Sequence, residues 1–185
     1  MSTPFRTRRF EPVAPHLRPR RFRQAARVIV TDGVHTLMLA DTDPGLPGSR
    51  WWVTPGGGID PGETPVAAAV RELVEETGLV VDPSELLGPV ASRTVVHGYS
   101  DQILSQVEHF FVVRVSEPFE LSPGGLTADE QLTLDGWAWH RLAQLTDLTE
   151  PVWPANLTEL AALAGRPDAW PVDLGEIEES TLPVN

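Results

Sequence analysis

The sequence predicts an α/β fold in which strands precede and follow one central helix. Three observations carry this prediction. A helix over residues 65–77 has both of its ends defined by the residues there, runs of β-branched and aromatic residues lie on each side of it, and an amphipathic helix is expected over residues 154–164. A chain of 185 residues is long enough to form one domain of ordinary size with a buried core.

Two strands joined by a tight turn are expected at the start of this domain. Residues 25–30 and 34–40 flank Asp32 and Gly33, a pair typical of the turn in a β-hairpin. Residues 41–49 contain two prolines and two glycines, so a loop is expected there. A short aromatic strand is then expected at residues 51–54, and it leads into a run of glycines.

The central helix is defined by the residues at its two ends. Thr64 can cap its first turn, and Pro65 suits the first helical position, where a missing amide hydrogen does no harm. Gly78 suits the left-handed residue that ends a helix. Apolar side chains recur at three- and four-residue steps on one face of this helix. The opposite face carries three acidic residues, Glu72, Glu75 and Glu76.

Three more strands and two more helices are expected after the central helix. The strands are predicted at residues 86–99, with a turn near residues 97–98, and at residues 107–115 and 136–139. A polar loop is expected at residues 117–130, a short helix at 140–145, and the closing helix ends at Gly165. The chain is thereby divided into an arginine- and proline-rich arm (1–23), the domain (24–166) and an acidic tail (167–185).

Charge is distributed unevenly along the chain. Residues 1–27 hold eight arginines and one acid, a net charge of +7, so the remaining residues carry −19 of the total of −12. Such an arm can bind RNA phosphates, pack on its own acidic domain, pair with a second subunit in a homodimer, or stay disordered. A strongly acidic body repels long nucleic acids, so a small nucleotide is the expected partner rather than a nucleic acid.

Composition excludes several classes of site. Cysteine is absent, which rules out disulfides, thiolate metal sites and cysteine nucleophiles. The sequence has no run of 18 apolar residues, so no membrane span is expected. The first arginines are not followed by the apolar segment of a secretory signal, and a cytoplasmic protein is therefore predicted.

The acidic face of the central helix predicts a metal site. Residues three and four apart stack on a helix, so the three carboxylates lie about 5–6 Å apart and repel one another. Magnesium reverses this effect, because it binds oxygen ligands at about 2.0–2.1 Å and leaves room for substrate phosphates. A solvated acidic face is the alternative. Residues 55–58 (Pro-Gly-Gly-Gly) favour the metal site, since glycine lets the backbone approach a ligand closely.

The wider spacing of these residues resembles a known motif. Gly57 is followed after five residues by Glu63, and after seven more by Arg-Glu-Leu-Val-Glu-Glu-Thr-Gly-Leu over residues 71–79. This pattern is similar to the complete Nudix box of the Nudix hydrolase superfamily. The resemblance implies an α/β/α sandwich with a mixed β-sheet. It also implies metal-dependent hydrolysis of a nucleoside diphosphate linked to another moiety, with Mg²⁺ as the usual ion and Mn²⁺ able to substitute.

The resemblance also implies roles for the box residues. The carbonyl of Gly57 and the carboxylates of Glu72, Glu75 and Glu76 are expected to hold metal, and Glu72 is alternatively the general base. Arg71 is expected to orient carboxylates, including that of Glu63.

One more carboxylate outside the box often completes such a site. Glu130, in the loop before the strand at residues 136–139, is the first candidate for this position, and Glu108 on the preceding strand is the second.

The substrate is left open by the sequence. Trp51, Trp52 and Tyr99 are candidates for stacking on a base, although packing in the core is the ordinary role of large aromatic side chains. A nucleoside triphosphate, a sugar nucleotide, ADP-ribose and a dinucleoside polyphosphate all fit a Nudix hydrolase. Two alternatives are a pyrophosphohydrolase of RNA 5′ ends that uses the arginine arm, and a non-catalytic module that senses nucleotides.

Overall fold

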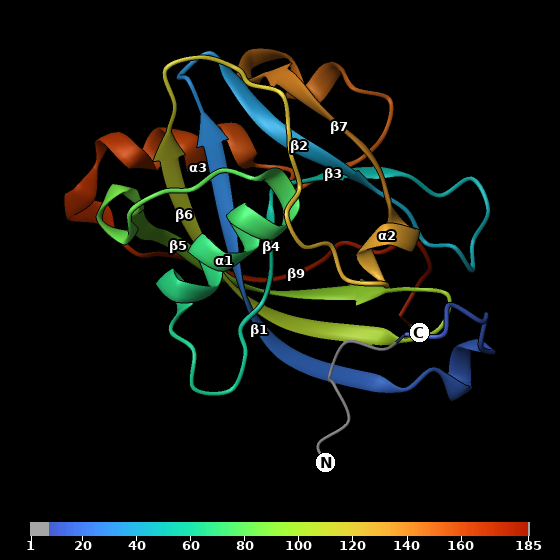
Figure 1. Cartoon of the computed structure of the whole chain (residues 1–185). Coiled ribbons are helices and arrows are strands. Elements are labelled where there is room, and N and C mark those ends of the chain that lie inside the picture. Colours follow the sequence, from blue (N-terminus) through green and yellow to red (C-terminus); the bar gives the residue numbers. More distant parts are fainter. Residues whose placement is uncertain (1–7, 185) are drawn as a thin grey trace.

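The structure is a computed structural model in which residues 8–184 are described. Nine strands form one curled, mixed sheet with the order β8-β3-β2-β1-β6-β5-β9, to which β4 and β7 are added by pairing with β1 and β2 (Figure 1). The strands are β1 (Arg20–Thr31), β2 (His35–Asp41), β3 (Trp51–Val53), β4 (Gly56–Gly58), β5 (Leu87–Gly98), β6 (Ile103–Arg114), β7 (Leu134–Arg141), β8 (Val152–Trp153) and β9 (Val172–Glu178). The α-helices are α1 (Pro65–Thr77), α2 (Glu130–Thr133) and α3 (Leu157–Ala162).

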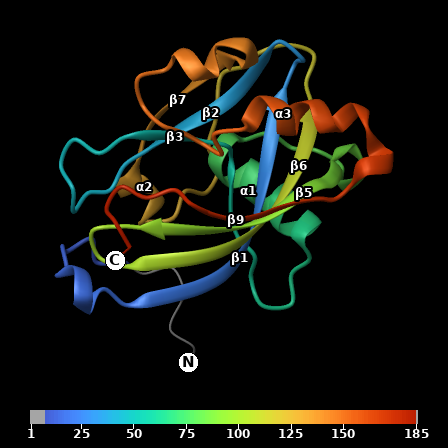
Figure 2. The ribbon, with the colours of Figure 1, turned by 180° about the vertical axis from the view of Figure 1, so that it is seen from behind.

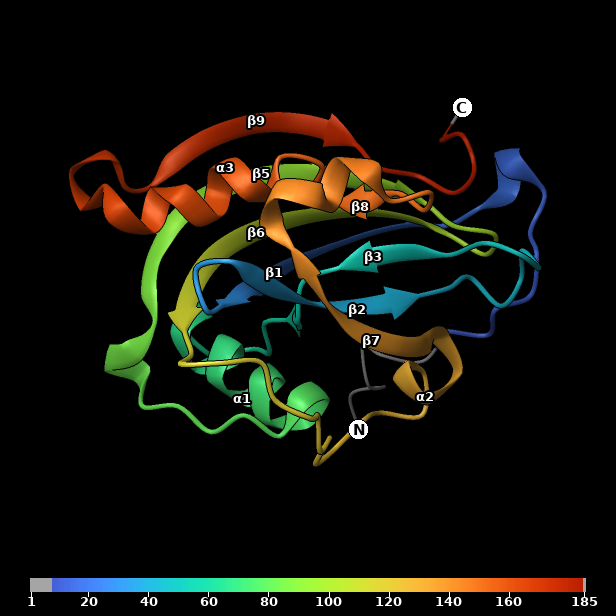
Figure 3. The ribbon, with the colours of Figure 1, turned by 90° about the horizontal axis from the view of Figure 1, so that it is seen from above.

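Helices cover both faces of the sheet, as the predicted sandwich requires. Helix α1 lies in front of the sheet in Figure 1, and α3 lies in front of it in the reversed view of Figure 2. The view from above in Figure 3 shows the sheet between these two helices. Alternate residues of a strand point to opposite faces. On β1, Val28 therefore joins the core beneath α1, while Ile29 joins the core beneath α3.

The predicted central helix is confirmed residue by residue. Helix α1 spans Pro65–Thr77, and the amide of Ala67 donates to the hydroxyl of Thr64 over 3.2 Å. Gly78 ends the helix with a φ of 76°, which is the left-handed conformation that glycine adopts at no steric cost. Leu73 is fully buried in the apolar core between α1 and the sheet.

The other predicted elements are found with shifted boundaries. The turn expected at residues 97–98 lies instead at residues 99–102, where the amide of Tyr99 donates to the carbonyl of Gln102. The short helix expected at residues 140–145 is a 3₁₀ helix at Leu142–Asp147. The closing α-helix is shorter than expected, because its last turn becomes a 3₁₀ turn at Leu163–Gly165.

Two segments predicted to lie outside the domain contribute to the sheet. Residues 20–23 of the expected arm form the start of β1 and pair in parallel with residues 103–106 of β6. Residues 172–178 of the expected tail form β9, which pairs in parallel with β5, and Leu174 packs on the core beneath α3. Residues 1–7 of the arm lie outside the described residues.

Candidate metal centre and substrate cavity

Two carboxylates of α1 face the glycine strand β4. Glu72 and Glu76 lie one turn apart, with only 1% and 7% of their surface exposed. The amide of Gly56 donates to Glu76 Oε2 over 2.7 Å. A Cβ atom at Gly57 would lie 2.7 Å from Glu72 Oε1, closer than real Cβ contacts come. Only glycine at position 57 therefore leaves the Glu72 carboxylate where it lies.

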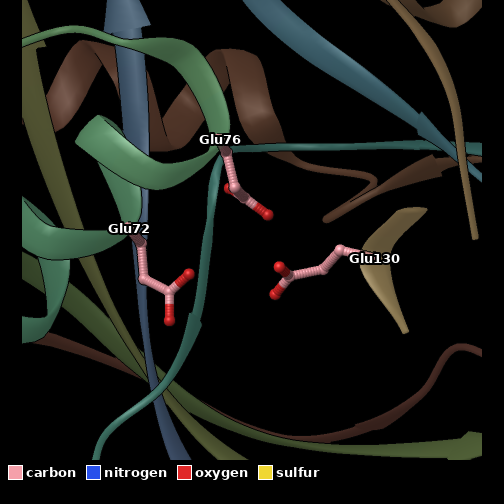
Figure 4. Close-up of side chains that lie close together, drawn as sticks. All are labelled: Glu72, Glu76 and Glu130. Atoms are coloured by element: carbon pink, nitrogen blue, oxygen red, sulfur yellow. The ribbon is translucent and has the colours of Figure 1, made fainter. Parts of the chain in front are cut away.

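Glu130 completes a group of three carboxylates. It begins α2 rather than lying in the loop as expected, and it points across the cavity toward Glu72 and Glu76 (Figure 4). One carboxylate oxygen of each residue lies within 4.8 Å of the others. Burial, together with the charge of Glu72, raises the pKa of Glu76 well above its usual range. A hard divalent cation fits this all-oxygen donor set, because it offsets the repulsion and prefers such ligands.

Arg71 binds the carboxylates that surround this group. Its guanidinium donates to both oxygens of Glu63 over 2.9 Å, to Glu72 Oε1 over 2.6 Å and to Glu75 Oε2 over 3.1 Å. It also donates to the carbonyl of Gly58 over 2.9 Å. The hydrogen bonds to Glu63 and Glu72 raise the pKa of Arg71 although burial lowers it, so its charge is permanent.

The expected ligand Glu75 is therefore placed differently from Glu72 and Glu76. It is partly exposed and turned toward Arg71, and it is not a member of the three-carboxylate group among the described residues.

Glu108, the second candidate for the additional carboxylate, lies in a different network. It is buried between Arg27, at 3.0 Å, and Arg93, at 2.7 Å. Burial opposes ionisation, but these two cations outweigh it and lower the pKa of Glu108 to about 2. Arg27 in turn donates to the carbonyl of Gly56 over 2.7 Å, so the pair holds strand β4 from the side opposite Glu76. This role of Arg27 was not predicted from the sequence, although an arginine inside an apolar strand is a signal for it.

A cavity of about 780 Å³ opens in front of the three carboxylates. Arginines form much of its wall, namely Arg8, Arg9, Arg21, Arg23 and Arg27. Arg8 pairs with Asp101, and Arg27 pairs with Glu108. Within residues 8–184, no carboxylate forms an ion pair with Arg9, Arg21 or Arg23. The cavity thus combines an acidic group with three guanidinium groups that form no ion pair within residues 8–184.

The three aromatic candidates fall in different places. Tyr99 lines the cavity, where burial raises the pKa of its hydroxyl to about 12. Trp51 lies behind Tyr99, with ring centroids 6.1 Å apart, and Trp52 packs edge-on against His140. Both tryptophans are buried, and neither lines this cavity among the described residues. Their contacts are those of core side chains.

Comparison with known proteins agrees with this geometry. The family model of the NUDIX domain matches residues 21–161. The chain belongs to the Nudix family. It is similar to an RNA pyrophosphohydrolase of Rhodopseudomonas palustris, with 36% identity over 129 residues that cover 61% of this chain and 71% of the relative. An RNA pyrophosphohydrolase of Caulobacter vibrioides is 34% identical over 111 residues, which cover 54% of this chain and 61% of that protein.

Solved Nudix structures share the fold. A MutT protein from Bacillus halodurans superposes with a TM-score of 0.57 at 18% identity, covering 86% of this chain and 91% of the other. A NUDIX-family hydrolase from Clostridium perfringens gives a TM-score of 0.51 at 18% identity, covering 77% and 95%. This Nudix protein is accordingly an enzyme of the pyrophosphohydrolase type. Among the described residues, no helix combines the length and apolar character needed to cross a bilayer.

Proposed function

We propose that this Nudix enzyme hydrolyses the pyrophosphate bond of a nucleotide and depends on a divalent metal ion, Mg²⁺ or Mn²⁺. One observation carries the proposal: the acidic group of Glu72, Glu76 and Glu130 shares a single cavity with three arginines that lack a carboxylate partner within residues 8–184. A polyphosphate chain complements such a cavity, because its oxygens suit both a carboxylate-held cation and guanidinium groups.

The metal ion, when bound, would lower the pKa of water and offset charge on the phosphate oxygens. Glu72, Glu76 and Glu130 are the carboxylates that would hold it, and the carbonyl of Gly57 and the carboxylate of Glu75 are further candidates. Glu72 is also a candidate to accept the proton of the attacking water. Arg71 donates to Glu72 Oε1 over 2.6 Å and thereby orients this carboxylate.

The arginines of the cavity have a separate role in this proposal. Arg21 and Arg23 follow one another at alternate positions on β1 and both line the cavity. The side chain of Arg23 is oriented by Gln106, which accepts a hydrogen bond from its Nε over 2.5 Å. These guanidinium groups would bind the phosphates that are not in contact with the acidic group. Because Gln106 orients Arg23 in the free protein, the Arg23 guanidinium would stabilise charge that develops during the reaction with little reorganisation.

A pyrophosphohydrolase acting on RNA 5′ ends is the second candidate function. The relatives named above favour it, and so does the basic start of β1, where Arg20 and Arg21 are exposed and Phe22 is 69% exposed. Exposed arginine and aromatic side chains are the groups that bind phosphates and stack on bases of single-stranded RNA. Variants of this exposed surface separate an RNA substrate from a small nucleotide more sharply than variants of the acidic group do.

A direct assay separates these functions. Nucleoside triphosphates, a dinucleoside polyphosphate, ADP-ribose, a sugar nucleotide and a 5′-triphosphorylated oligoribonucleotide are incubated with Mg²⁺ or with chelator, and the released phosphate, pyrophosphate and monophosphate products are quantified. We expect turnover that requires metal on at least one small nucleotide. Turnover confined to the oligoribonucleotide and abolished by Arg20→Ala together with Phe22→Ala would favour the RNA function. Tight binding without turnover of any compound would favour the sensor.

A further inference from the structure

The third carboxylate of the acidic group lies on an element that packing does not fix. Helix α1 is anchored by buried side chains, but α2, which carries Glu130, has no buried residue. It follows a stretch of irregular chain that begins after β6. The position of such a segment depends on a few polar contacts, because little apolar area resists its displacement. Thr42 supplies some of these contacts, donating to the carbonyl of Thr133 over 2.9 Å and 2.8 Å.

A second anchor of α2 comes from outside the region that the NUDIX domain model matches. The backbone amide of Arg8 donates to Asp129 Oδ2 over 2.9 Å, and Asp129 is the residue immediately before Glu130. Residues 8–13 are here called the strap, and all of them except Pro12 line the same cavity as Glu130. The strap therefore connects the start of α2 to the opposite rim of the cavity.

The strap is held at that rim by several contacts. The guanidinium of Arg8 binds Asp101 through two hydrogen bonds, and its Cζ atom lies 4.5 Å from the ring centroids of both Phe10 and Tyr99. The amide of Val13 donates to the carbonyl of Ser100 over 2.9 Å. Phe10 has a φ of 53°, an unusual conformation for a residue other than glycine, which persists only where surrounding contacts impose it.

The rim itself is rigid. Asp43, which is 1% exposed, accepts hydrogen bonds of 2.6 Å from both the amide and the hydroxyl of Ser100. It also accepts a hydrogen bond from the amide of Gly45. A Cβ atom at Gly45 would lie 2.8 Å from the carbonyl of Phe10, so the loop that contains Gly45 closes tightly against the strap. Arg8 consequently connects α2, which has no buried residue, to this rim, because its backbone amide binds Asp129 and its guanidinium binds Asp101.

We propose that Arg8 is a positioning residue of the metal centre: by binding Asp101 with its side chain and Asp129 with its backbone, it holds Glu130 within the acidic group. This inference rests on the proposed function only in taking the acidic group as a metal site. The contacts of Arg8 with Asp101 and Asp129 do not depend on that function. The strap is thus a part of the site that the Nudix box does not encode, and it makes metal binding depend on the N-terminal residues of the chain.

The test measures metal binding and strap protection as well as turnover. Arg8→Ala and Asp101→Asn each remove the ion pair, Arg8→Lys keeps the charge, and Arg114→Ala is the matched control, an exposed arginine that does not line the cavity. Mn²⁺ titration by calorimetry gives the dissociation constant, and hydrogen exchange of the peptide that covers residues 8–13 reports whether the strap stays in place. Thermal unfolding of each variant verifies that it is folded.

We expect Arg8→Ala and Asp101→Asn to weaken Mn²⁺ binding by roughly 10-fold and to speed exchange in the strap. The double variant Arg8→Ala/Asp101→Asn should lose no more affinity than either single variant. Arg8→Lys should retain part of the affinity, and Arg114→Ala should bind Mn²⁺ like the unaltered protein. Faster exchange with unchanged Mn²⁺ affinity would overturn the proposal. If metal binding responds as expected but no nucleotide is hydrolysed, the proposed function fails while the positioning role stands.

Discussion

At the scale of single residues, the site depends on which carboxylates of α1 point into the cavity. Glu72 and Glu76 are buried and face β4, whereas Glu75 is partly exposed, and Arg71 binds both Glu72 and Glu75. The sequence predicts all three as ligands, because helical spacing places them on one side. Spacing does not say which of these side chains will be buried against the glycine strand, so the difference between Glu75 and its neighbours becomes visible only in the structure. Glu130 could be predicted only as the acid before a strand.

Glutamine substitutions test this difference between neighbouring glutamates. Glu76→Gln should reduce turnover by on the order of 100-fold or more, since it removes an anionic oxygen from the acidic group and keeps the shape of the side chain. Glu75→Gln should reduce turnover less, because it weakens only the contact with Arg71. Steady-state kinetics at saturating Mg²⁺ measures both effects. Equal losses in the two variants would show that Glu75 also enters the metal site.

Gly57→Ala tests the close approach of β4 to α1. The added methyl group would lie 2.7 Å from Glu72 Oε1, so either the strand or the carboxylate must move. We expect turnover to fall by roughly 10- to 100-fold, as when the support of a metal ligand is lost. Gly165→Ala is a suitable control because an added Cβ there meets nothing within 4 Å. Full activity of Gly57→Ala would show that the Glu72 position is unimportant.

At the scale of elements, the sequence predicts best what local residues determine. Helix α1 has its cap, its first-turn proline and its terminal glycine within the segment itself, and its boundaries are confirmed. Strand β9 has no such signals, because its acidic residues read as a solvated tail and its pairing partner lies about 80 residues earlier on β5. The start of β1 is not predicted for the same reason, because its arginines give no sign of the pairing with β6.

His97 on β5 gives the fold a dependence on pH. Its ring is 3% exposed, stacks on Tyr99 and has its Nδ1 2.6 Å from the carbonyl of Glu179. Burial, only partly offset by the charge of Glu108, lowers the pKa of His97 to about 4 from an ordinary value of 6.5. Between these two values the unfolded chain binds more protons than the folded one. The free energy of unfolding should therefore fall by on the order of 3 kcal/mol as the pH drops from 6.5 to 4.

Urea unfolding at several pH values measures this effect. His97→Gln should flatten the decline between pH 6.5 and pH 4, whereas His16→Gln, at an exposed position, should leave it unchanged. A decline that is equally steep in all three proteins would assign the acid sensitivity to other groups.

At the scale of the whole molecule, a buried network of charges ties the C-terminal segment to the cavity. Glu179 follows β9 and binds Arg93 through two hydrogen bonds, Arg93 binds Glu108, and Glu108 binds Arg27 on the cavity wall. Each member is largely shielded from water. Loss of one partner would leave a buried charge uncompensated, which is far costlier than loss of an exposed ion pair.

Glu179→Gln tests the contribution of this segment to stability. We expect the free energy of unfolding to fall by about 3 kcal/mol at neutral pH, because Arg93 then keeps only one anionic partner. Glu176→Gln, at an exposed position on β9, should change it by less than about 0.5 kcal/mol. If both variants unfold at the same urea concentration as the unaltered protein, residues 172–179 behave as the solvated tail that the sequence predicts.

The central claim is that carboxylates from α1 and α2 form one divalent metal site. Titration of Mn²⁺ followed by electron paramagnetic resonance tests it most directly, with the unaltered protein, Glu76→Gln, Glu130→Gln and the exposed control Glu120→Gln. The predicted result is that binding is weakened by about 10-fold or more in the first two variants and is unchanged in the control. Equal Mn²⁺ affinity in all four proteins would contradict the assignment of the site.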